Sequence, residues 1–194
     1  LLLGSTNGLI EIKLETEGVK TIGTTLENKH VVSIAFDGEN QLWAGTDEHG
    51  LFIFDKTGSQ KQIKAYQGIG HNRVYSLFKD ENENMWVGTD GAGVSLFKGF
   101  QFSELRIEQL YQPSFITALH IDKKGTLWAG SEGQGVVSMN KQKTTHYNTS
   151  NGLSNNYVRS ITSDNDGKVY IATNNGITVI NKNRKSYLRK PRDL

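Results

Sequence analysis

The chain repeats itself every 42 or 43 residues around an aromatic side chain, and this period constrains its fold more than any other feature. The aromatic residues that follow one another at these intervals are Trp43, Trp86, Trp128 and Tyr170. An earlier fifth copy is found at Leu2-Leu3-Gly4-Ser5. A repeat of about 40–45 residues is the length of one β-propeller blade.

Each copy contains four short segments with the composition of β-strands, which we call strands a, b, c and d. In the second copy they are Val31–Phe36, Leu42–Thr46, Leu51–Phe54 and Gln62–Tyr66. Such lengths, with polar or Gly-bearing turns between them, are typical of strands and too short for helices. We therefore predict an all-β fold: a β-propeller with four complete four-stranded blades and one partial blade that lacks its strand a.

The predicted blade repeats span approximately residues 1–29, 30–72, 73–114, 115–156 and 157–194, within a single β-propeller fragment over residues 1–194. An open arc of blades leaves exposed strand edges, which natural proteins normally cover. We therefore expect a fragment of a larger propeller of about seven blades. A homodimer through the exposed edges is a further expectation, and a closed ring of five blades would contradict both.

An aspartate stands six residues before each aromatic residue, where strand a turns into strand b. The four are Asp37, Asp80, Asp122 and Asp164. An Asp side chain that closes its own tight turn explains this position without catalysis. We interpret the repeated Trp, and the Gly two residues after it, as core residues. Between blades, the large side chain would pack against the small residue.

The composition excludes several function classes. A formal net charge of +2 is too close to neutral to indicate nucleic-acid binding. The absence of cysteine excludes disulfides, a Cys nucleophile and thiolate metal sites.

The segment Asp164–Gly167 begins like a calcium loop, but Asn175 stands where the bidentate Glu should be. We predict no cofactor, no metal site and no catalytic residue, and we do not interpret the N-terminus as a signal peptide.

Polar residues that differ between the copies are expected to gather at one end of the blades, because the d-to-a and b-to-c connections of a meander emerge at the same end. One variable position, just after the first Val or Ile of strand a, reads Val32, Tyr75, Thr117 and Arg159. Aromatic rings beside fixed polar groups suit a carbohydrate ligand. The candidate ligand-binding residues are His30, His49, His71, Arg73, Tyr75, Tyr157 and Arg159.

The repeat resembles the two-component regulator propeller repeat. The resemblance rests on segments such as Asp122-Lys123-Lys124-Gly125-Thr126-Leu127-Trp128-Ala129-Gly130-Ser131 and on the link Asn151-Gly152-Leu153-Ser154-Asn155-Asn156-Tyr157-Val158. It extends over essentially the whole chain, although Tyr170 and Ala172 replace the usual Trp and Gly.

This resemblance implies a periplasmic, ligand-sensing propeller segment of a hybrid two-component system in a gut Bacteroidetes species. Such propellers stand outside the inner membrane, respond to oligosaccharides and pass the signal to a histidine kinase and a transcription-regulating output. The remainder of the propeller and of the sensor chain would then be partners, and this segment would not be an enzyme. Two alternatives stay open: a protein-interaction scaffold, and a lyase or hydrolase that uses His49 with Asp47 and Glu48, or His71 with Arg73.

Overall fold

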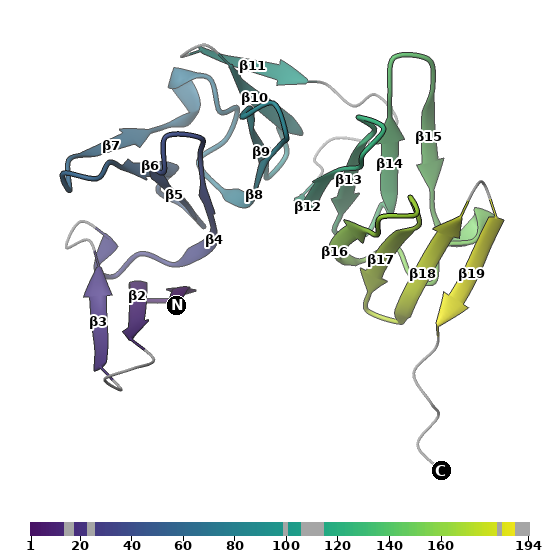
Figure 1. Ribbon diagram of the computed structural model, residues 1–194, viewed down its shortest axis with the longest axis horizontal. Coiled ribbons are helices and arrows are strands. Elements are labelled where there is room, and N and C mark those ends of the chain that lie inside the picture. Colours follow the sequence, from purple (N-terminus) through teal and green to yellow (C-terminus); the bar gives the residue numbers. More distant parts are fainter. Residues whose placement is uncertain (14–17, 23–25, 99–100, 106–114, 182–183, 189–194) are drawn as a thin grey trace. The chain divides into compact units, whose positions relative to one another are not determined.

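The computed structural model describes residues 1–13, 18–22, 26–98, 101–105, 115–181 and 184–188. Contacts divide the chain into two compact units, unit 1 (Leu1–Leu105) and unit 2 (Arg106–Leu194). Both units consist of antiparallel sheets in which each strand pairs with the strand next to it in the sequence. Figure 1 shows these meandering sheets in chain order.

Unit 1 contains one three-stranded and two four-stranded sheets. The three-stranded sheet has β1 (Leu2–Ser5), β2 (Gly8–Lys13) and β3 (Gly18–Ile22). The second sheet has β4 (Val31–Phe36), β5 (Leu42–Thr46), β6 (Leu51–Phe54) and β7 (Gln60–Ile63). The third has β8 (Val74–Lys79), β9 (Met85–Thr89), β10 (Val94–Lys98) and β11 (Gln101–Leu105).

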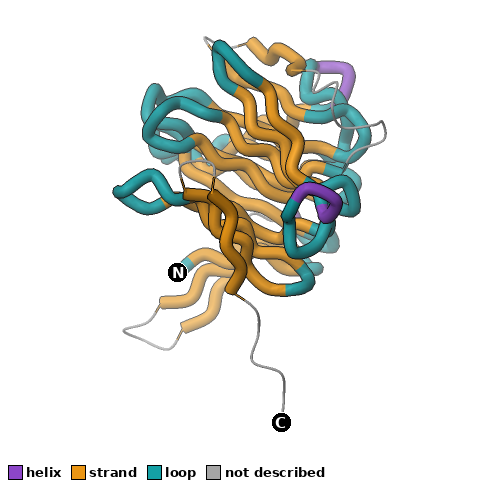
Figure 2. The backbone as a smooth tube through the Cα atoms, turned by 90° about the vertical axis from the view of Figure 1, so that its right-hand side faces the viewer, coloured by secondary structure: helices purple, strands orange, loops and turns teal. Residues whose placement is uncertain are grey.

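Unit 2 contains two four-stranded sheets. The first has β12 (Ile116–Ile121), β13 (Leu127–Ser131), β14 (Val136–Met139) and β15 (Thr144–Tyr147). The second has β16 (Val158–Ser163), β17 (Val169–Thr173), β18 (Gly176–Asn181) and β19 (Arg184–Leu188). Tight loops join the antiparallel strands (Figure 2). The predicted all-β fold of four complete blades and one partial blade is confirmed.

One strand prediction is wrong in its second half. Strand d of the second copy ends at Ile63 instead of Tyr66, and Ala65–Gln67 form the short 3₁₀ turn η2. The Gln67 side chain accepts a hydrogen bond from the Lys64 amide at 2.9 Å, and Gly68 has a φ of 107°. These two features close a turn, which an extended strand does not allow.

The repeated aspartates hold the turn from strand a to strand b, as predicted. Oδ1 of Asp37 accepts hydrogen bonds from the amides of Glu39 and Gln41, at 3.0 and 2.8 Å. Its second oxygen accepts the indole N–H of Trp43 at 2.9 Å, a contact that the sequence pattern alone did not reveal. The other blades repeat it with the pairs Asp80–Trp86, Asp122–Trp128 and Asp164–Tyr170.

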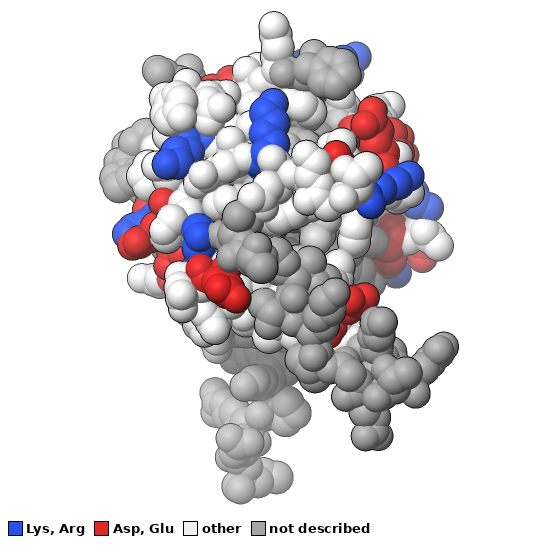
Figure 3. All heavy atoms as spheres, turned by 90° about the vertical axis from the view of Figure 1, so that its left-hand side faces the viewer, with Lys and Arg blue, Asp and Glu red and all other residues white. Residues whose placement is uncertain are grey.

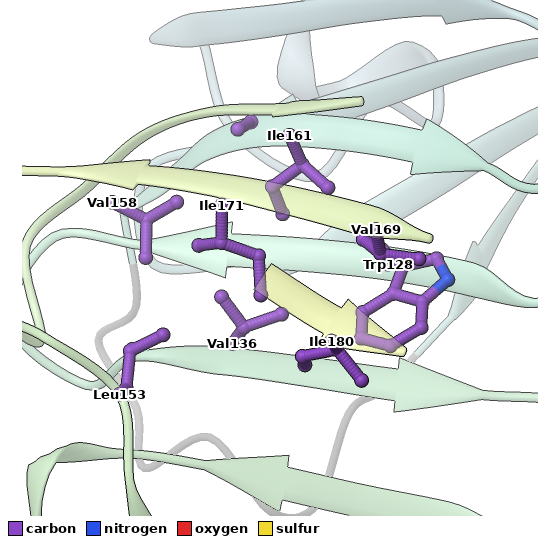
Figure 4. Close-up of a cluster of buried hydrophobic side chains, with 9 residues drawn as sticks. Trp128, Val136, Leu153, Val158, Ile161, Val169, Ile171 and Ile180 are labelled. Carbon is purple, nitrogen blue, oxygen red and sulfur yellow. The ribbon is translucent and has the colours of Figure 1, made fainter. Parts of the chain in front are cut away.

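The core lies between successive blades of each unit. In unit 2, Trp128 packs with Val169 and Ile180 of the following blade, within one buried cluster (Figure 4). A Cβ on Gly130 would lie 2.5 Å from Cγ1 of Val158, so only glycine lets the next blade approach so closely. The predicted packing of a large residue with a small one is therefore confirmed.

Unit 1 repeats this arrangement. The ring of Trp43 lies edge-on to Phe97 of the following blade, with 5.2 Å between centroids, and Gly45 lies directly against Val74. A hydroxyl also joins successive a strands: Ser33 donates to the carbonyl of Val74 at 3.3 Å. These contacts make each blade depend on its neighbour for burial.

The surface is mixed in charge. On the face drawn in Figure 3, the described acidic and basic side chains are interspersed. Among the described residues, no helix has the length and hydrophobicity needed to cross a bilayer.

Candidate ligand-binding face

A β-bulge recurs at the start of strand a in all four complete blades. The pairing of strands a and b skips one residue between Val31 and Ser33, and the same shift occurs in β8, β12 and β16. The skipped residues are Val32, Tyr75, Thr117 and Arg159. This is the position that varies between the copies, because a bulged residue leaves the ladder and its side chain is re-aimed.

The two sets of loops expected at this end do meet there. In each complete blade, the first residue after strand b donates its amide to a carbonyl of the link before strand a. The donor–acceptor pairs are Asp47–His30 (3.0 Å), Asp90–Arg73 (3.1 Å), Glu132–Phe115 (3.0 Å) and Asn174–Tyr157 (3.1 Å). This end of the blades, with the bulges and both sets of loops, is here called the loop face.

On the loop face of unit 1, Arg73 lies between two carboxylates. Its guanidinium is 3.2 Å from Oδ2 of Asp90 and 3.5 Å from Oε1 of Glu48. Asp90 is buried, whereas the Arg73 side chain is 41% exposed. The hydrogen bond with Asp90 is the main reason that the pKa of Arg73 is raised. The position of this cation is therefore fixed by the protein itself.

A second chain of contacts runs beside it. The hydroxyl of Tyr75 donates to Oδ1 of Asp47 at 3.2 Å, and Nδ1 of His30 lies 3.6 Å from the other oxygen of Asp47. Burial, together with the negative charge of Asp47, raises the pKa of Tyr75 to about 12. Tyr75 therefore stays a neutral donor at neutral pH.

Unit 2 presents a different set of groups at the same end. Nε of Arg159 donates to Oδ1 of Asn174 at 2.7 Å, and its Nη1 is 3.9 Å from Oε1 of Glu132. Tyr157 is 45% exposed, and its ring lies over Gly133, where a Cβ would be 3.8 Å from Cζ. The ring of Tyr157 therefore rests on the loop that contains Gly133.

The structure brings five of the seven candidates into these two clusters: His30, Arg73 and Tyr75 in unit 1, and Tyr157 and Arg159 in unit 2. His71 has a local role, because its Nδ1 accepts a hydrogen bond from the amide of Arg73 at 3.1 Å. His49 is exposed and is held through its backbone, whose amide donates to Thr46 Oγ1 at 2.9 Å.

The candidate list omitted the partners of these residues. Asp47, Asp90, Glu132 and Asn174 all come directly after strand b and hold the candidate side chains. The signal was an acidic or amide residue at one fixed position of each of the four complete copies. Among the described residues, no group of three or more His, Cys, Asp or Glu side chains is arranged to hold a metal ion.

Comparison with known families matches two segments, residues 68–91 and 152–175, to the two-component regulator propeller. The extracellular domain of a hybrid two-component system from B. thetaiotaomicron is 29% identical, with a TM-score of 0.71. That match covers 84% of this chain and 22% of the other, so the chain spans about a fifth of that domain. Comparison with curated protein sequences gave no match.

Two further solved structures support the fold alone. A second hybrid two-component extracellular domain from B. thetaiotaomicron is 18% identical, with a TM-score of 0.52, and the match covers 96% of this chain and 41% of the other. Virginiamycin B lyase from Staphylococcus aureus is 10% identical, with a TM-score of 0.74 and coverages of 99% and 70%. At these identities the propeller architecture is what the proteins share.

Proposed function

We propose that this chain, which carries the two-component regulator propeller repeat, is a ligand-sensing segment of a hybrid two-component sensor, placed in the periplasm as part of an inner-membrane protein. The similarity to a sensor extracellular domain over 84% of the chain supports this. Further blades, to about seven, together with a histidine kinase and a transcription-regulating output, would belong to the remainder of the protein. The segment itself would sense and would not catalyse.

The ligand that we propose is an oligosaccharide bound at the loop face. The repeated bulge carries this proposal, because every complete blade turns one variable side chain out of the ladder at this end. In unit 2 the exposed ring of Tyr157 can stack under a sugar ring. Arg159 and Asn174, already bonded to each other, offer fixed polar groups for hydroxyls.

Calorimetric titration with a panel of plant, host and microbial oligosaccharides tests this proposal. We expect one glycan class to bind, and we expect Tyr157→Ala and Arg159→Ala each to weaken binding by about tenfold, the loss of ~1.4 kcal/mol. Lys123→Ala, in the turn at the opposite end of β12, is the matched control and should bind like wild type.

Two results would contradict the proposal. If no glycan of the panel binds, protein interaction becomes the better-supported function of the loop face. If a glycan binds but is then cleaved, the chain is an enzyme, in the manner of the lyases that share its fold.

A homodimer through exposed strand edges is a further part of the proposal. Light scattering coupled to size exclusion should give twice the 21.6 kDa mass of the chain. A monomer at all accessible concentrations would remove the dimer from the proposal and leave the sensing role untouched.

A further inference from the structure

A pocket of about 600 Å³ lies between the second and third blades of unit 1, at the end opposite the loop face. Its apolar floor consists of Ile53 and Phe97, which are partly exposed, together with Trp43 and Met85, of which only 1% is exposed. The rim consists of the a-to-b turns of both blades and the c-to-d hairpin of the second blade. A volume of about 300–1,000 Å³ is typical of small-molecule sites. We call this pocket groove 1.

The rim of groove 1 carries more negative than positive charge. Four carboxylates, of Asp37, Glu39, Asp55 and Glu83, face two ammonium groups, of Lys61 and Lys98. Lys79, outside the lining, holds Glu83 at 2.7 Å, and the carboxylates still exceed the ammonium groups by one. The field over this apolar floor therefore favours a cation.

Unit 2 has a pocket at the corresponding place, between its two blades, which we call groove 2. It has a volume of about 550 Å³ and contains Asp122 and Trp128, the counterparts of Asp37 and Trp43. The other carboxylates are replaced: Glu39 corresponds to Lys124, Asp55 to Asn140 and Glu83 to Gly167. Groove 2 thus has two lysines, Lys124 and Lys143, against one carboxylate.

The difference in charged residues between the two grooves distinguishes the residues that the fold requires from those that a ligand could use. The Asp–Trp pair occurs in both grooves and holds the blade together. The carboxylate of Asp55 is not needed for its turn, because Oδ1 of Asn140 accepts the same kind of backbone hydrogen bonds, at 2.9 Å, from Gln142 and Lys143. The extra negative charge of groove 1 is therefore free to serve binding.

We propose that groove 1 is a binding site for a small organic cation, an ammonium group attached to an apolar body. The apolar part would lie on Ile53 and Phe97, and the ammonium group would face Glu39 and Asp55 at the rim. Asp55 is suited to this, since the hydrogen bond from Thr57 chiefly holds its pKa below the usual value. The proposal concerns the end of the blades away from the loop face and does not depend on the sensing role.

The probe is hexylammonium, compared with hexanol and hexanoate, which keep the apolar chain and change only the charge. The chain contains three tryptophans, one in each of three blades, so ¹⁵N-labelled protein gives three indole N–H signals. We expect hexylammonium to move the Trp43 signal saturably and to leave that of Trp128, in groove 2, unmoved. Binding should weaken as salt is raised.

The variant Glu39→Lys/Asp55→Asn gives groove 1 the residues that groove 2 already tolerates, so its fold should be intact. We expect its affinity for hexylammonium to fall by about tenfold or more, which corresponds to at least ~1.4 kcal/mol. Lys56→Ala, in the same hairpin but outside the lining, removes a positive charge and should bind hexylammonium at least as tightly as wild type.

Three results would overturn the proposal: equal binding of hexanol and hexylammonium, unchanged affinity in the double variant, or equal shifts of the Trp43 and Trp128 signals. Each would mean that the carboxylates of groove 1 select no cation. Glycan binding at the loop face would be unaffected by any of them, so the two proposals fail separately.

Discussion

Replacing Asp80 should test what holds each blade turn together. Oδ1 of Asp80 accepts hydrogen bonds from the amides of Asn82 and Asn84, both at 2.9 Å, and Oδ2 accepts the indole N–H of Trp86 at 2.9 Å. The residue is 6% exposed, so water cannot fully replace these bonds. The side-chain amide of Asn84 also donates to both oxygens, at 3.1 and 2.9 Å. Asp80→Ala removes all of these acceptor contacts, whereas Asp80→Asn keeps an oxygen for the backbone and loses the charge.

The magnitude follows from four donor groups: two backbone amides, the indole N–H and the side-chain amide of Asn84. Hydrogen bonds to charged groups contribute about 1.5–3 kcal/mol each, but the contributions of neighbours are not additive and the turn lies at the surface. We therefore expect Asp80→Ala to lower the free energy of unfolding by ~3 kcal/mol. Asp80→Asn should cost ~1.5 kcal/mol, because its amide can offer only one oxygen to these four donor groups.

Urea denaturation followed by circular dichroism measures both values, since it does not depend on indole fluorescence. Trp86→Phe and the double variant Asp80→Asn/Trp86→Phe complete a cycle, which should give a coupling of ~1 kcal/mol between the two side chains. A cost below ~1 kcal/mol for Asp80→Ala, or a coupling near zero, would refute the claim that this aspartate joins the turn to the aromatic residue.

Three further outcomes follow from the same contacts. Burial opposes the ionisation of Asp80, but its hydrogen bonds outweigh burial and lower its pKa. The stability that the ionised carboxylate contributes is present above the ordinary pKa of ~3.9 and is lost as pH falls through the lower pKa of the folded state. The urea midpoint of the wild type should therefore fall more steeply in acid than that of Asp80→Asn. Gly45→Ala places a Cβ 2.8 Å from the carbonyl of Val74, and we expect a loss of ~3 kcal/mol or more by thermal unfolding. Gly58→Ala should cost about 1–2 kcal/mol, because its Cβ would meet nothing within 4 Å and only its φ of 84° strains an alanine. Equal losses would contradict the close approach of the blades. In an ultraviolet titration, Tyr75→Phe should remove a tyrosine that ionises near pH 12, and loss of one that ionises near pH 10 would contradict its burial beside Asp47.

The repeat period and the turn aspartates were enough to predict the architecture, because each blade is built from local pairings between strands adjacent in the sequence. The limits of the strand before Gly68 were not predictable, because the turn there depends on a side-chain contact from Gln67. The sequence also showed which position of strand a varies. It could not show that a bulge is the cause, since a bulge is a property of the pairing between two strands.

The candidate site was predicted in part for the same kind of reason. Loop positions follow from topology, so Tyr75, Tyr157 and Arg159 were placed at the correct end of the blades. Side-chain contacts between blades do not follow from the topology, because they join residues far apart in the sequence. The contact of Tyr75 with Asp47, for example, joins residues 28 positions apart. Groove 1 was missed because its lining comes from turns that look like ordinary solvated loops when each is considered by itself.

Tyr170 shows what the repeat requires at its most recognisable position. Its hydroxyl reaches Oδ2 of Asp164 at 2.9 Å, the same length as the bond from the indole N–H of Trp43 to Asp37. In this chain the position is therefore filled by a flat apolar ring that carries a donor within reach of the turn, whether that ring is an indole or a phenol. A blade that has lost its tryptophan can still be recognised by an aspartate six residues before a tyrosine, so degenerate blades elsewhere in such propellers should be detectable from this pair.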